Sequence, residues 1–269
     1  MDEIPRFSKD DPKFKEFFDD NGCVVLNDVY NNEEIKELQN TIKKILQKQI
    51  GTNLDGVELK ESNGFDKGII EYFGKNDDLR SRFYNVIQGI LPLYKCATKN
   101  DLLNVISQCG VLEPVIFIPP QIRMDLPEDE RFLQPVHQEI RGTKSTKMTF
   151  AITALCDISN EKGALKVGLG SHKLGPITPK IQEDMKYQYI PPEIYEEKFP
   201  LIQVPIVEGE TIILNKHTLH ASSPNVSDEG RWQMISRYED ALNMPYLEGD
   251  DSIEKNFDVQ KNAHIISKK

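Results

Sequence analysis

The stretch Met148-Thr149-Phe150-Ala151-Ile152-Thr153-Ala154-Leu155 is the longest of several short apolar or β-branched runs beyond residue 110. The others also follow Gly110 and are separated by Pro, Gly, Asn and Asp: 115–118, 164–167, 201–207 and 211–214. Short strands at such spacing predict a β-sandwich or a barrel. Residues 232–238 alternate in the same way, which predicts one further strand with two distinct faces.

The first 110 residues have a different pattern, which predicts helices. Residues 11–22 read as a short helix that ends at Gly22, and 23–26 as a buried strand. Asn31 with Glu34 three residues later resembles a capping box, so we expect a second helix from there to Gly51. No linker-like segment divides the chain. We therefore expect one domain over 1–269: a mostly helical layer over 1–110, a β core over 111–240 and a tail over 241–269.

Composition and charge limit the partners. The chain has 269 residues, of which 38% are hydrophobic and 28% charged, as in an ordinary globular protein. Its formal net charge of −10 would repel a phosphate backbone. Residues 1–11 lack the features of a secretory signal, and no run approaches the ~18 apolar residues of a membrane helix. We expect a cytoplasmic protein with neither nucleic acid nor a membrane as partner; the sequence identifies no protein partner.

The candidate metal ligands lie in Pro135-Val136-His137-Gln138-Glu139. His137 and Glu139 are two residues apart, so on a strand they share a face and could grip one ion. His220, which follows the expected strand 211–214, supplies a plausible third ligand. Two imidazoles and one carboxylate form the facial triad of non-haem Fe(II) oxygenases, which leaves three coordination positions open.

A cation and a hydroxyl lie close to His220 in the sequence. Ser222 is two residues beyond it and Arg231 is eleven residues beyond it. Because a guanidinium matches a carboxylate bidentately, this pair could hold a carboxylate near the metal. Gln121 and Arg123 lie on a strand candidate before the first histidine and could face the same pocket as substrate contacts; a surface salt bridge or a sheet edge is an equal alternative.

Together these motifs resemble the phytanoyl-CoA dioxygenase family. The resemblance runs from about residue 14 to 240 and rests on 137–139, 157–165, 170–173, 209–211 and 220–225, followed by Arg231. It implies a double-stranded β-helix, a jelly roll of cupin type, with an N-terminal helical layer. It also implies an Fe(II)- and 2-oxoglutarate-dependent dioxygenase that uses O2 to hydroxylate a small molecule and releases succinate and CO2.

The resemblance also implies individual roles. His137, Glu139 and His220 would bind the iron, Ser222 and Arg231 would hold the distal carboxylate of 2-oxoglutarate, and Gln138 would touch the co-substrate. One departure matters: the family usually has Asp where this chain has Glu139, so the carboxylate is displaced by about one C–C bond.

Several alternatives stay open from the residues alone. His217 lies three residues before His220 and could ligate a metal, whereas His172 is better explained as a structural residue and His264 as an exposed one. Tyr187, Tyr189 and Tyr195 lie in a long loop, 169–200, that could cover the site. The competing functions are a hydrolase or isomerase that uses another divalent metal at the same site, and a metal- or 2-oxoglutarate-binding protein without turnover.

Overall fold

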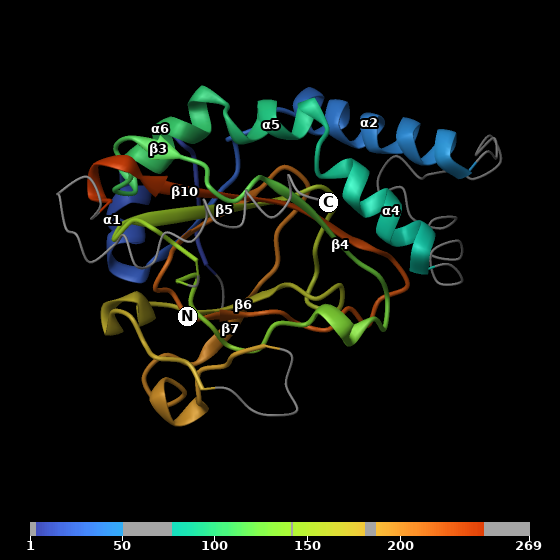
Figure 1. The fold of residues 1–269 in the computed structure, drawn as a ribbon. Helices are drawn as coiled ribbons and strands as arrows, with labels where there is room; N and C mark the ends of the chain where they lie inside the picture. The colour runs from blue at the N-terminus through green and yellow to red at the C-terminus, as the bar shows by residue number, and fades with distance from the viewer. Residues whose placement is uncertain (1–3, 51–76, 141, 181–186, 245–269) are drawn as a thin grey trace, which may run out of the picture.

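A computed structural model describes residues 4–50, 77–140, 142–180 and 187–244. They form a layer of helices over two β-sheets (Figure 1). The helices are α1 (Lys13–Asn21), α2 (Asn32–Ile50), α4 (Asp77–Ile87), α5 (Leu91–Ala97) and α6 (Asn100–Gln108), with short 3-10 helices at Glu130–Phe132, Ser171–Leu174, Pro192–Ile194 and Ala241–Asn243.

The larger sheet has seven strands. Its order is β1 (Arg6–Phe7), β2 (Cys23–Leu26), β8 (Thr211–Asn215), β5 (Met148–Ala154), β10 (Arg231–Asp240) and β3 (Pro114–Val115), and β4 (Gln121–Asp125) pairs with the first half of β10. All these pairings are antiparallel except that of β1 with β2. The smaller sheet has the order β7 (Leu201–Val204), β6 (Leu165–Gly168) and β9 (His220–Ala221).

The helical layer covers one face of the larger sheet (Figure 1). Strand β10 shows how the two faces differ. Trp232, Met234 and Tyr238 belong to the hydrophobic core, and the Tyr238 hydroxyl donates a hydrogen bond of 2.6 Å to the Ala97 carbonyl of α5. The alternate residues, including Gln233 and Arg237, line a cavity on the opposite face. The alternation predicted for 232–238 is thus confirmed, and it directs polar side chains into the space between the sheets.

The helix start and stop motifs expected in the N-terminal part are present in the structure. The Asn31 amide donates to a Glu34 carboxylate oxygen and the Glu34 amide donates to Asn31 Oδ1, each at 2.9 Å. This reciprocal capping box begins α2. Helix α1 ends at Gly22, whose φ of +66° lies in the left-handed region and whose amide donates to the Phe18 carbonyl.

The structure differs from the expected extent of one strand and adds detail to the segment 169–200 and to the tail. The strand predicted over 115–118 is wrong in extent, because only Pro114–Val115 pairs with β10. The long segment 169–200 contains two 3-10 helices and a bridge between Lys180 and Tyr189, with 181–186 outside the described residues. Of the expected tail, Met244 is buried, and 245–269 also lie outside the described residues. Among the helices that the structure describes, none has the length and apolarity to cross a bilayer.

Gly22 offers a test of how the end of α1 packs against the segments that contain His172 and Thr218. A Cβ at this position would lie 2.4 Å from His172 Nδ1 and 2.5 Å from Thr218 Oγ1, in addition to the strained φ. We expect Gly22→Ala to lower the free energy of unfolding by more than the ~1–3 kcal/mol of backbone strain alone. Gly110→Ala is the control: its φ is +95°, but nothing lies within 4 Å of its Cβ. Urea unfolding that shows equal losses for the two variants would refute the close packing at Gly22.

Candidate metal centre and its cavity

Two histidines from distant parts of the chain are joined by their backbones. The His137 amide donates to the His220 carbonyl at 3.0 Å and the His220 amide donates to the His137 carbonyl at 3.1 Å. His220 begins β9, whereas His137 precedes a turn and does not belong to a regular strand. The next anchor is Glu139, whose amide donates to the Lys216 carbonyl at 2.9 Å. These backbone bonds place the three side chains on one side of the bridge.

The orientation of both imidazoles is set by backbone carbonyls. His137 Nδ1 lies 2.8 Å from the Pro135 carbonyl oxygen and His220 Nδ1 lies 3.0 Å from that of Thr218. A carbonyl only accepts, so each Nδ1 carries the proton and each Nε2 presents a lone pair. Burial lowers the pKa of His137, and burial together with the charge of His137 lowers that of His220 to about 3. Both rings are therefore neutral at physiological pH, as metal ligands must be.

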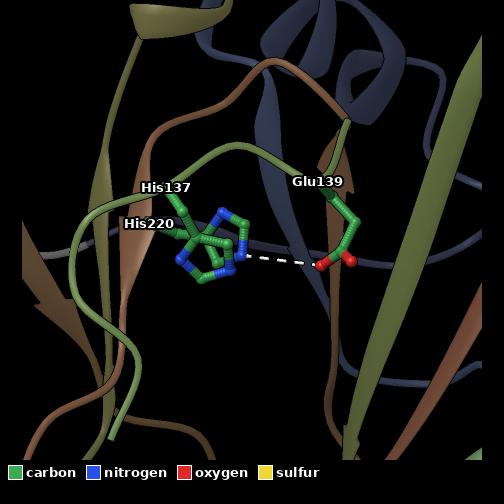
Figure 2. Close-up of side chains that lie close together, drawn as sticks. All are labelled: His137, Glu139 and His220. Carbon is green, nitrogen blue, oxygen red and sulfur yellow. Dashed lines mark ion pairs between the residues drawn. The ribbon is translucent and has the colours of Figure 1, made fainter. Parts of the chain in front are cut away.

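Glu139 completes the group (Figure 2). Its Oε2 lies 3.9 Å from His220 Nε2, and its Oε1 accepts a 3.1 Å bond from Nε of Arg237. Burial alone would raise the pKa of Glu139, but the charge of Arg237 and its hydrogen bond to the carboxylate bring the pKa below its ordinary value. The carboxylate is therefore ionised at neutral pH.

The three residues fit a divalent metal. One possible ligand atom from each of His137, Glu139 and His220 lies within 4.8 Å of the others. Two neutral imidazoles, each oriented by a second hydrogen bond, and one carboxylate are the donor set of non-haem iron sites. Within the described part of the chain this is the one group of three such residues.

The triad lies in the wall of a cavity of about 530 Å³ between the two sheets. Its lining comes from α4, from β4, β5 and β10 of the larger sheet, and from the small sheet. A volume of this size suits a small-molecule ligand. Five arginines line it, against two carboxylates: Arg80, Arg123, Arg131, Arg231, Arg237, Asp125 and Glu139.

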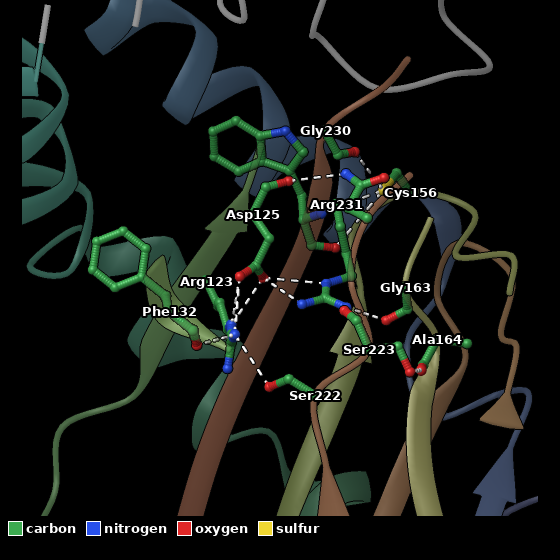
Figure 3. Close-up of polar contacts among 12 residues, drawn as sticks. Arg123, Asp125, Phe132, Cys156, Gly163, Ala164, Ser222, Ser223, Gly230 and Arg231 are labelled. Atoms are coloured by element: carbon green, nitrogen blue, oxygen red, sulfur yellow. Dashed lines mark hydrogen bonds and ion pairs between the residues drawn. The ribbon is translucent and has the colours of Figure 1, made fainter. Parts of the chain in front are cut away.

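Deeper in the cavity, Asp125 lies between two arginines (Figure 3). It accepts from Arg123 Nε at 2.8 Å and from Arg231 Nη2 at 2.9 Å. Arg231 also donates to the carbonyls of Gly163 and Ser223, and Arg123 donates to Ser222 Oγ at 3.3 Å. Two guanidinium charges against one carboxylate leave this cluster with a net charge of +1.

The structure places most of the expected side chains in the cavity wall. Ser222, Arg231, Gln121 and Arg123 all line it, together with the triad and Tyr187. Gln138 is different: its amide nitrogen donates to the carbonyls of Gly175 and His217, and its oxygen accepts from the Ile177 amide. The side chain is thus used to hold a loop, and the expected contact with a co-substrate has no support from its position.

The remaining histidines and tyrosines fall outside the metal group. His172 Nε2 lies 3.1 Å from the Asp19 carbonyl oxygen, in agreement with a structural role. His217 is not part of the triad, and its carbonyl accepts from Gln138. Tyr195 is buried in a small cluster with Ile190 and Leu219. His264 lies outside the described residues.

Two functional candidates were missed by the sequence analysis, Asp125 and Arg237. Both could have been found from alternation, because Asp125 shares a strand face with Gln121 and Arg123, and Arg237 shares one with Arg231. What no local pattern shows is the pairing of β4 with β10, which brings these two faces together.

Asp125 gives a prediction with a defined pH dependence. Burial would raise its pKa, but Arg123 and Arg231 lower it on balance, so the folded protein binds a proton at this group less readily than the unfolded chain. Its stabilisation is complete above the unfolded pKa of ~3.9 and is lost as the pH falls through the lower folded value. We expect Asp125→Asn to cost about 3–5 kcal/mol at pH 7, because it leaves buried cations without a counter-charge.

Urea unfolding at pH 7 and at pH 3 checks this. The difference between wild type and Asp125→Asn should shrink at the lower pH, because pH 3 lies below the unfolded pKa of ~3.9 and the unfolded wild-type chain then binds the proton. Asp10→Asn, whose side chain is 82% exposed, is the control and should have little effect at either pH. A difference that stays constant with pH would contradict the ionised state of Asp125.

Comparison with known proteins agrees with this site. The family model described as phytanoyl-CoA dioxygenase (PhyH) matches residues 18–232. Human peroxisomal phytanoyl-CoA dioxygenase is 22% identical over 258 residues, which cover 91% of this chain and 73% of that protein. The fold is similar to EctD from S. alaskensis with 2-oxoglutarate and 5-hydroxyectoine (TM-score 0.60, 15% identity, 88% of this chain and 78% of that chain). It is also similar to the epimerase SnoN in complex with Fe3+ and alpha ketoglutarate (TM-score 0.57, 16% identity, 85% and 83%). The chain belongs to the phytanoyl-CoA dioxygenase family.

Proposed function

We propose that this protein is an Fe(II)- and 2-oxoglutarate-dependent dioxygenase that hydroxylates a small molecule, with release of succinate and CO2. The observation that carries the proposal is the convergence of His137, Glu139 and His220, with both Nε2 lone pairs available, on a cavity of about 530 Å³. Membership of the family supports the cofactor and the co-substrate.

In this proposal the triad holds the iron and other residues position the reactants. Bound Fe(II), with 2-oxoglutarate and O2, supplies the oxidation, since no protein side chain provides such chemistry. The backbone bonds at Pro135 and Thr218 keep the two imidazoles neutral and directed at one point. His220 is buried and His137 and Glu139 are half-buried, which limits access of water to the reacting atoms.

We assign the distal carboxylate of 2-oxoglutarate to Arg231 and Ser222. The support is electrostatic, because the cluster of Arg123, Asp125 and Arg231 has an uncompensated positive charge beside the Ser222 hydroxyl. One carboxylate would balance it. Asp125 keeps Arg231 in place before the ligand arrives, so less side-chain entropy is lost on binding.

The substrate would lie against the cavity wall opposite the small sheet. Gln121 and Arg123 remain our candidates for contacts there, and Tyr187 lines the same cavity. We further propose that the two sheets are the double-stranded β-helix, that the helical layer shares one domain with them, and that the protein acts in the cytoplasm. Support for one domain comes from the core, where Phe14 and Leu38 of the helices belong to the same cluster as Trp232.

An anaerobic titration with Fe(II) and then 2-oxoglutarate tests the function. We expect the wild type to develop the weak visible charge-transfer band of an iron–2-oxoglutarate complex and Glu139→Ala to show none. Arg231→Gln should weaken 2-oxoglutarate binding roughly 10- to 100-fold, because a charge-assisted hydrogen bond contributes about 1.5–3 kcal/mol. Arg82→Gln, which changes an exposed arginine of α4, is the control for charge alone.

The other outcomes identify the competing functions. Metal binding without any response to 2-oxoglutarate would favour a hydrolase or isomerase. Binding of both, with no oxygen uptake and no succinate for any substrate tried, would favour a binding protein without turnover. Turnover with a product that carries no new hydroxyl would keep the dioxygenase but change the reaction.

A further inference from the structure

Arg237 is a cation in direct contact with a candidate metal ligand. It lies on β10, on the face that lines the cavity, and its side chain is 14% exposed. Its Nε donates to Glu139 Oε1 at 3.1 Å, and its Nη1 donates to Gln121 Oε1 at 3.0 Å. Gln121 belongs to the adjacent strand β4, so the guanidinium is held from two sides.

The two oxygens of the Glu139 carboxylate have different partners. Oε1 accepts from Arg237, whereas Oε2 is the oxygen that lies 3.9 Å from Nε2 of His220. A carboxylate can ligate a metal through one oxygen or through both. With Oε1 already bound by a cation, only Oε2 is directed at the histidines.

Ligation by one carboxylate oxygen or by both changes how many coordination positions of the metal stay free. A facial triad leaves three of six positions open, and the proposed reaction needs all three, two for 2-oxoglutarate and one for O2. A carboxylate that ligated through both oxygens would take one of them. Glutamate has one more rotatable bond than aspartate, so its carboxylate has more freedom to turn both oxygens to the metal.

We propose that Arg237 is a positioning residue that reserves Oε1 of Glu139, so that this glutamate ligates through Oε2 alone and three positions stay open. The inference rests on the proposed function. Arg237 can restrain a glutamate in this way but could not contact an aspartate. An Asp carboxylate would end roughly 1.5 Å short of the present position, beyond hydrogen-bond reach of Arg237.

The inference predicts opposite effects on metal and co-substrate. Arg237 is a positive charge beside the ligand, so its removal relieves a repulsion and should leave Mn(II) affinity, measured from the EPR signal of free Mn(II), unchanged or higher. We expect Arg237→Gln to weaken 2-oxoglutarate binding to the Fe(II) protein at least 10-fold, measured by the anaerobic charge-transfer band. Arg237→Lys keeps a cation near Oε1 and should restore most of the affinity. If Arg237→Gln instead disrupted the fold, the variant would lose affinity for both Mn(II) and 2-oxoglutarate.

The decisive test repeats the Arg237→Gln substitution in a protein that already carries Glu139→Asp. If Arg237 acts through the carboxylate, adding Arg237→Gln to Glu139→Asp should change 2-oxoglutarate affinity by less than about threefold. An equal loss in both backgrounds would show that Arg237 contacts 2-oxoglutarate itself and would overturn the inference. Loss of Mn(II) binding in Arg237→Gln, or unchanged 2-oxoglutarate binding, would overturn it as well. A wild type that binds Fe(II) but not 2-oxoglutarate would overturn the proposed function and this inference with it.

Discussion

The pair of backbone hydrogen bonds between His137 and His220 is the constraint on which the site depends. It joins a loop to the edge of the small sheet and fixes where both imidazoles begin. The side chains then need only one more hydrogen bond each, to a carbonyl two residues away, to direct Nε2 inward. Because those carbonyls belong to the same short segments, the orientation of the ligands is a property of the backbone and does not require distant side chains.

The larger sheet contributes charged side chains to the cavity but none of the three candidate metal ligands. Strands β4 and β10 pair so that Gln121, Arg123 and Asp125 lie opposite the cavity-facing residues of β10. Each carboxylate that lines the cavity has at least one arginine as partner: Asp125 has two, and Glu139 has Arg237. Buried charges are tolerated in this arrangement because each is paired and hydrogen-bonded. With Asp129 included, which pairs with Arg80 and Arg131, five arginines face three carboxylates, and this excess of positive charge makes the cavity receptive to an anionic ligand.

The sequence analysis recovered the parts of the site that have a local pattern. Spacing alone identified His137 with Glu139, and the alternation in 232–238 identified the two faces of β10. What depends on pairing between distant strands, such as the contact of Arg237 with Gln121, could not be predicted from the sequence, nor could what depends on a turn. The orientation of Gln138 follows from the same rule that predicted a shared face for its neighbours. If 137 and 139 share a face in extended chain, 138 points away from it, and the structure shows this side chain holding the Gly175–Ile177 loop.

The substitution of Glu for the more usual Asp at position 139 is best understood together with the strand opposite it. A glutamate side chain has one more rotatable bond than an aspartate side chain, and an unrestrained one would lose entropy on metal binding. Arg237 and Gln121 remove part of that freedom before any metal arrives, and they do so from the paired strands β10 and β4 of the larger sheet. The site therefore extends beyond the three residues that a spacing motif identifies, and Arg237, the residue we propose to position Glu139, is found only when the two sheets are considered as one site.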